Sequence, residues 1–123
     1  MNILKIAIVQ PTLYWEQPLK NIENLTILIS QIEENTHLIV LPEMFNTGFS
    51  LRPETFSEKM DGLTISWLKK VSIDTNAAIT GSLMIEEAGK YFNRLVWVED
   101  GEVEYYYDKR HLFSWGRCSI CCW

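Results

Sequence analysis

Two ionisable residues stand directly after segments that have the composition of β-strands. Glu43 follows the apolar run at 37–41 and Pro42, and Lys109 follows the aromatic run at 103–107 and Asp108. Open α/β sheets place their sites at the C-terminal ends of strands, so both are candidate site residues, and we expect their side chains within one small-molecule pocket at the ends of neighbouring central strands. Partial burial that raises the pKa of Glu43 would make it a general base, and the Lys109 ammonium could stabilise an oxyanion. Each also has a structural explanation, as a solvated charge that ends a strand.

Cysteine is the third residue type here that could do chemistry. All three, Cys118, Cys121 and Cys122, fall within the last six positions of the 123-residue chain. The spacing of Cys118 and Cys121 occurs in redox pairs and in half of a zinc site, but zinc needs four ligands and only His111 is near. A redox pair would need a helix that begins at these cysteines, and an odd, clustered set closes no useful disulfide loop. We therefore expect no metal site and no disulfide.

The first half of the chain predicts a strand, a helix and a second strand. The apolar run at 3–9 is typical of a strand buried on both faces, and the run at 37–41 is a second strand that Pro42 stops. Between them apolar residues recur every three or four positions, which predicts a helix with one buried face. They are Leu19, Ile22, Leu25, Ile29 and Ile32. Such a unit joins parallel strands by a right-handed crossover.

A second helix and a three-stranded meander are expected after this unit. Residues 47–62 predict a loop with at most a short helical turn, and Thr64 is the expected N-cap of a helix that ends near Asn76. Its buried face would hold Trp67, Leu68 and Val71. Strands are expected at 77–85, 91–98 and 103–107, joined by tight turns at 87–90 and 100–101. The sequence thus predicts an α/β fold with a mixed sheet and two main helices.

Composition and charge exclude several function classes. Hydrophobic residues make up 47% of the chain, yet no apolar run approaches the roughly 20 residues that span a bilayer. The first apolar segment follows Met1 without the features of a signal peptide, so we expect a cytoplasmic location and no membrane partner. The net charge of -5 argues against binding to nucleic-acid phosphates, so we also expect no nucleic-acid partner.

Several short motifs occur in an order that resembles a known family. They are KIAIVQ at 5–10, LPEMF at 41–45, TGF at 47–49, GS at 81–82, YFNR at 91–94 and YDKRHLF at 107–113. Together they resemble the carbon-nitrogen hydrolase (nitrilase) superfamily over residues 3–113. The segments at 44–50 and 109–113 are similar to its omega-amidase branch, which hydrolyses the amide of short dicarboxylate monoamides such as 2-oxoglutaramate.

The resemblance implies both a fold and a mechanism. Residues 1–113 would be the N-terminal part of a nitrilase-type α-β-β-α sandwich. By position, Glu43 matches the general base of a Glu-Lys-Cys triad, and Lys109 matches the cation that holds the oxyanion. The family uses no metal or organic cofactor, acts on small-molecule amides and forms homo-oligomers at full length. These properties are expectations for the parent enzyme of this chain.

After Phe113 the sequence departs from the family pattern. The second family glutamate has no counterpart, and residues 120–122 only superficially resemble the turn that carries the nucleophile. Cys121 comes too soon after Lys109, and two residues after it cannot form a sharp turn that presents its sulfur and an oxyanion donor. We therefore do not expect Cys121 to be the nucleophile. We predict that the chain stops before the catalytic cysteine and is inactive alone.

The segment at 114–123 has no strand alternation and no helical stripe, so we expect an aberrant, disordered tail. A nucleotide inserted after the Trp115 codon is one hypothesis for its origin, because an Ala-Gly-Ala continuation would then read Gly-Arg-Cys. Resequencing the DNA tests this hypothesis. The alternative function is a non-catalytic α/β structural or regulatory protein derived from the same fold.

Overall fold

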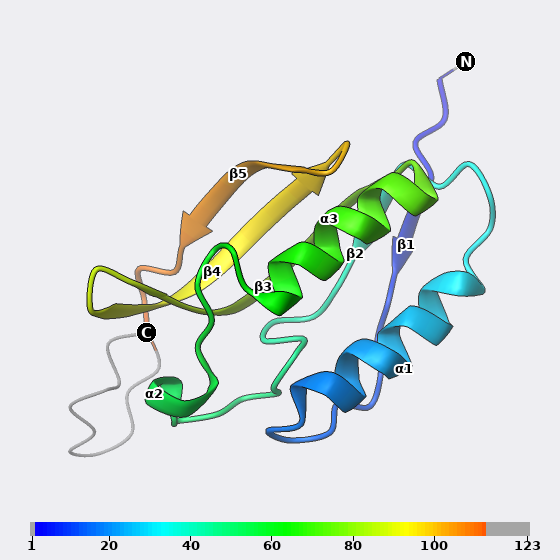
Figure 1. The fold of residues 1–123 in the computed structure, drawn as a ribbon. Coiled ribbons are helices and arrows are strands. Elements are labelled where there is room, and N and C mark those ends of the chain that lie inside the picture. The colour runs from blue at the N-terminus through cyan, green and yellow to red at the C-terminus, as the bar shows by residue number, and fades with distance from the viewer. Residues whose placement is uncertain (1, 113–123) are drawn as a thin grey trace.

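Five strands form one mixed sheet, and two long helices lie on one of its faces (Figure 1). The computed structural model describes residues 2–112. The elements are β1 (Ile6–Ile8), α1 (Pro18–Ser30), β2 (Leu38–Val40), α2 (Pro53–Phe56), α3 (Leu63–Thr75), β3 (Ala78–Glu87), β4 (Lys90–Glu99) and β5 (Glu102–Asp108). The sheet order follows the chain, with β1, β2 and β3 parallel and β3, β4 and β5 antiparallel. This confirms the predicted α/β fold, the mixed sheet and the two main helices.

The two hairpin turns are the ones that the sequence predicts. Ala88 and Gly89 join β3 to β4 with φ values of 52° and 74°, and Asp100 and Gly101 join β4 to β5 with φ values of 51° and 77°. Positive φ at both central residues matches the right-handed twist of the flanking strands, and glycine adopts it without a steric cost. The two turns set the register of the meander.

One apolar layer lies between the sheet and the two helices. It combines Leu25 and Ile29 of α1, Ile65, Leu68 and Val71 of α3, and Ile39, Ile79, Val96 and Val98 of the sheet. Burying a side chain of this size stabilises the fold by roughly 1.5–3 kcal/mol. Leu19 was expected in this layer, but it lies in the first turn of α1 and is 69% exposed. No helix within residues 2–112 is long and apolar enough to cross a membrane.

Thr64 is not the N-cap of the second helix, contrary to the sequence prediction. Gly62 is the N-cap, and Thr64 lies inside α3. The Thr64 N–H donates to Oε1 of Glu58 at 2.8 Å, so a glutamate that precedes the helix satisfies an otherwise unpaired donor of its first turn. A Cβ on residue 62 would lie 2.8 Å from that Oε1, which explains why a glycine precedes the helix.

The first strand is not buried on both faces, as its apolar composition predicted. Ile6 is 49% exposed and Ile8 is 70% exposed, because the helices cover only the face to which Ala7 belongs. Leu95, Tyr105 and Tyr107 share the uncovered face with these isoleucines, by strand alternation and register. They are 44%, 72% and 50% exposed. We call these five side chains the open face.

We expect the open face to make the purified chain self-associate, because contiguous exposed apolar surface on a sheet promotes association. Replacing Ile8 and Tyr105 with lysine should reduce the average mass measured by size-exclusion chromatography with light scattering. The matched control replaces Leu19 and Ile27 of α1 with lysine, and it should keep the average mass of the unmodified chain. These two side chains are 69% and 54% exposed. An unchanged mass for the Ile8 and Tyr105 variant would show that another surface drives association.

Candidate active site

A tight turn presents Glu43 just beyond the C-terminal end of β2. Ser82 of β3 holds this turn with two groups: its Oγ accepts the Met44 N–H at 3.1 Å, and its carbonyl accepts the Phe45 N–H at 3.2 Å. Met44 has a φ of 51°, a conformation that costs free energy for a residue with a side chain. The two contacts to β3 thus hold the residue next to Glu43 in a sparsely populated conformation.

Gly81 allows this turn to pack directly on β3. A Cβ at position 81 would lie 2.8 Å from Cδ1 of Phe45 and 2.9 Å from Cβ of Leu41. Both neighbours are buried in the core, so they have little freedom to move away. Glycine at this position therefore places the Glu43 turn against the middle of the sheet.

Glu43 and Lys109 are in direct contact. Nζ of Lys109 lies 2.7 Å from Oε1 of Glu43, and Nδ2 of Asn93 donates to the same oxygen at 2.8 Å. The contact agrees with the expectation that both residues lie in one pocket, but their strands are not neighbours as expected. β3 and β4 lie between β2 and β5. The residues still meet because β5 runs parallel to β2, so both strands end at the same edge of the sheet.

The pKa of Glu43 is lowered, not raised as the sequence suggested. The hydrogen bond from Lys109 is the largest cause, burial opposes it, and the hydrogen bond from Asn93 lowers the pKa further. Burial is weak because the side chains of Glu43 and Lys109 remain 55% and 40% exposed. Because its pKa is lowered, Glu43 contributes to the stability of the fold at pH values above the ordinary pKa of a glutamate. This contribution is lost as the pH falls through the lowered pKa. At neutral pH Glu43 is a carboxylate that can accept a proton.

The Glu43 and Lys109 pair lies in a pocket of about 330 Å³. Its lining consists of Leu41, Glu43, Ser82, Asn93, Leu95, Tyr107 and Lys109. Leu95 and Tyr107 belong to the open face, so the pocket opens on the side of the sheet that the helices do not cover. The pocket offers a proton acceptor and a cation to a small polar ligand, next to apolar walls. No cysteine occurs among residues 2–112.

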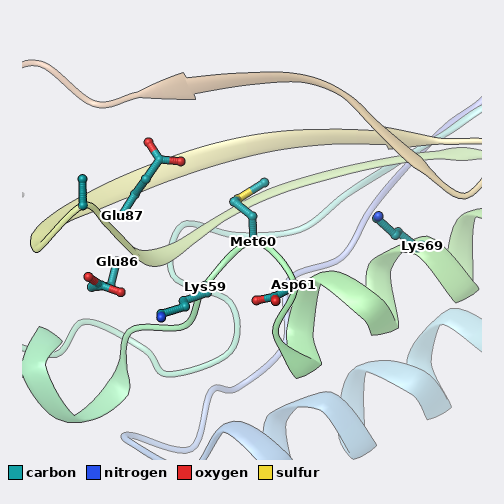
Figure 2. A pocket seen from close by; sticks show the side chains of 7 residues that line it. Lys59, Met60, Asp61, Lys69, Glu86 and Glu87 are labelled. Carbon is teal, nitrogen blue, oxygen red and sulfur yellow. The ribbon is translucent and has the colours of Figure 1, made fainter.

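A larger hollow of about 630 Å³ lies elsewhere, between the start of α3 and the β3–β4 hairpin (Figure 2). Five charged side chains surround it: Lys59, Asp61, Lys69, Glu86 and Glu87. Within the described part of the chain they form no ion pairs with one another. It therefore lacks the base and cation contact of the smaller pocket. Residues 2–112 also contain no group of three metal-ligating side chains.

Sequence reasoning missed the roles of Asn93 and Ser82. Both occur in the motifs that carry the family resemblance, but nothing assigned Asn93 to Glu43 or Ser82 to the Glu43 turn. The available signal was an asparagine inside a β-branched and aromatic strand, where asparagine is disfavoured. Asn93 is 3% exposed, and its Oδ1 has no hydrogen-bond partner among the described residues. The three cysteines and the expected tail at 114–123 lie outside the described residues.

Comparisons with known proteins identify the family of this chain. The carbon-nitrogen hydrolase family matches the chain over residues 5–119. Omega-amidase YafV of Yersinia enterocolitica is 34% identical over 119 residues, which cover 92% of this chain and 43% of that protein. The 2-oxoglutaramate amidase of Bacillus subtilis is 27% identical and is covered to 43%, with 89% of this chain aligned. The chain spans less than half the length of these relatives.

Solved structures show the same fold. XC1258 from Xanthomonas campestris, a CN-hydrolase superfamily protein with an arsenic adduct in its active site, superposes with a TM-score of 0.86 at 37% identity. The superposition covers 92% of this chain and 43% of XC1258. Nit3 of Saccharomyces cerevisiae, a nitrilase superfamily member, shares the fold with a TM-score of 0.81 at 21% identity, over 89% of this chain and 45% of Nit3. This chain belongs to the carbon-nitrogen hydrolase family.

Proposed function

We propose that Glu43 and Lys109 form part of a Glu-Lys-Cys site that hydrolyses the carbon–nitrogen bond of small omega-amides such as 2-oxoglutaramate. The observation that carries this proposal is the 2.7 Å contact between Nζ of Lys109 and Oε1 of Glu43 inside a pocket at the strand ends. The matched relatives named as an omega-amidase and a 2-oxoglutaramate amidase support the substrate class. The nucleophilic cysteine would come from a segment outside residues 2–112.

In this mechanism Glu43 takes the proton of the cysteine thiol, and the thiolate attacks the amide carbon. The negative charge that develops on the amide oxygen is stabilised by the Lys109 ammonium. Protonated Glu43 then gives its proton to the leaving nitrogen, so ammonia departs and a thioester remains. Water, deprotonated by Glu43, hydrolyses the thioester to the carboxylic acid and the free thiol. The net reaction converts an amide and water into an acid and ammonia.

The pocket suits a small substrate. Its volume of about 330 Å³ is near the lower end of the roughly 300–1,000 Å³ that ligand pockets occupy. Only one oxygen of Glu43 receives hydrogen bonds from the described residues, since Lys109 and Asn93 both donate to Oε1. Oε2 remains available as the proton acceptor. The lowered pKa of Glu43 keeps this carboxylate ionised before the thiol arrives.

A chimera tests the proposal. Residues 1–112 would replace the matched part of Omega-amidase YafV of Yersinia enterocolitica, with the rest of that protein unchanged. We expect ammonia release from 2-oxoglutaramate, and a loss of about 100-fold or more in kcat/KM for Glu43→Gln, the size of a general-base contribution. Lys109→Met should lose a comparable factor because the oxyanion loses its cation.

The matched control in the chimera is Glu23→Gln, which changes an exposed glutamate of α1 and should leave kcat/KM unchanged. Full activity of the Glu43→Gln chimera would contradict the assigned base. A folded chimera without any turnover would instead favour the alternative, a non-catalytic protein derived from this fold.

A further inference from the structure

A buried arginine lies next to the candidate active site in sequence but points to the opposite face of the sheet. Arg94 is 1% exposed, and its Nε and Nη2 donate to the two carboxylate oxygens of Asp108 at 2.7 and 3.0 Å. Its Nη1 donates to Glu87 at 3.2 Å. The guanidinium also stacks on two rings, 4.2 Å from the centroid of Tyr106 and 5.3 Å from that of Phe92. Arg94 is therefore fixed on several sides.

The strand register connects this arginine to Glu43. Arg94 and Asp108 are direct cross-strand partners on β4 and β5. One residue further along the chain from Asp108, Lys109 lies opposite Asn93, and the Lys109 N–H donates to the Asn93 carbonyl at 3.0 Å. Side chains alternate between faces along a strand, so this pair projects to the other side. There both side chains donate to Oε1 of Glu43.

We propose that Arg94 and Asp108 are positioning residues: their forked ion pair holds the end of β5 on β4 so that Lys109 and Asn93 reach Glu43 together. This proposal rests on the proposed roles of Glu43 and Lys109. Within the described residues β5 pairs with β4 alone, and strand ends held on one side open readily. A bidentate arginine and carboxylate pair fixes both distance and orientation, which a lysine cannot do.

We call the ion pair in which Nε and Nη2 of Arg94 donate to the two oxygens of Asp108 the fork. Two substitutions break the fork, and a third serves as their matched control. Arg94→Lys keeps the positive charge but removes the fork, and Asp108→Asn removes the charged acceptor on β5. Glu87→Gln also removes a carboxylate that contacts Arg94, but on β3, away from Lys109. All three are compared with the unmodified 123-residue chain, at a temperature at which circular dichroism shows each of them folded.

Two measurements report the position of Lys109 without requiring turnover. Carbon-13 NMR of the side-chain carboxyl gives the pKa of Glu43, and amide hydrogen exchange reports the hydrogen bond from Lys109 to Asn93. In Arg94→Lys and Asp108→Asn we expect the pKa of Glu43 to rise and the Lys109 amide to exchange about tenfold faster or more, because the strand end opens more often. In Glu87→Gln neither quantity should change in this direction.

The direction of the pKa change separates positioning from a direct charge effect. Loss of the Asp108 charge would by itself favour ionised Glu43 and lower its pKa, so a rise can come only from a displaced Lys109 or Asn93. An unchanged or lowered pKa in both fork variants, or an equal rise in Glu87→Gln, would overturn the proposal. These readouts are independent of ammonia release, so an inactive chimera with the expected pKa changes would reject the proposed function and leave the positioning role intact.

Discussion

Purified chain is expected to release no ammonia from 2-oxoglutaramate, succinamate or glutamine above the rate of its Glu43→Gln variant. Loss of the nucleophile alone removes most of a rate enhancement that spans about 10⁶-fold or more. Residues 2–112 contain no cysteine, so within the described part of the chain Glu43 has no thiol to activate. Without a thiol, Glu43 and Lys109 cannot form the thioester that divides the reaction into two easier steps.

The measurement is a coupled ammonia assay, with mass spectrometry for a thioester on Cys118, Cys121 or Cys122. The chimera with Omega-amidase YafV of Yersinia enterocolitica serves as the positive control, because it contains the same Glu43 and Lys109. Turnover by the chain that disappears in a Cys121→Ala variant would show that a cysteine of the tail is a working nucleophile.

Local signals in the sequence were sufficient for most of the fold. Turn residues such as Gly89 and Gly101 located both hairpins, because their positive φ is a property of two or three residues. Predictions failed where a distant group decided the outcome. The N-cap of α3 is Gly62 rather than Thr64, because Glu58 accepts the Thr64 N–H. The exposure of Ile6 and Ile8 depends on which face of the sheet the helices cover. Apolar composition cannot distinguish a strand covered on both faces from one covered on a single face.

The candidate site was predictable in part. Strand ends and family motifs pointed to Glu43 and Lys109, and the structure brings their side chains together. The pKa direction was wrong because the sequence did not reveal that Lys109 donates directly to Oε1 in an exposed setting, where a hydrogen bond outweighs burial. Asn93 was missed because its contact with Glu43 depends on the register of strands that are far apart in sequence.

Replacing Arg94 with methionine is expected to lower the free energy of unfolding by about 3 kcal/mol, because removing one partner of a buried ion pair leaves the other without compensation. The guanidinium cannot lose its proton to escape burial, and its hydrogen bond with Asp108 raises its pKa further. The estimate is at the lower end of the usual range because the side chains of Asp108 and Glu87 remain 29% and 54% exposed. This loss is a large fraction of the roughly 5–15 kcal/mol that stabilises a typical domain.

Urea unfolding followed by circular dichroism measures this change, and Lys70→Met is the matched control. Lys70 pairs with Asp74 one helical turn away on α3, with side chains 73% and 55% exposed, and such pairs contribute about 0.3–0.5 kcal/mol. Both variants exchange one cation for the same apolar side chain, so the difference between them reports burial and the fork rather than net charge. If the two variants lose equally little, the ion pair of Arg94 does not hold β5 on β4, and another contact must place Lys109 beside Glu43.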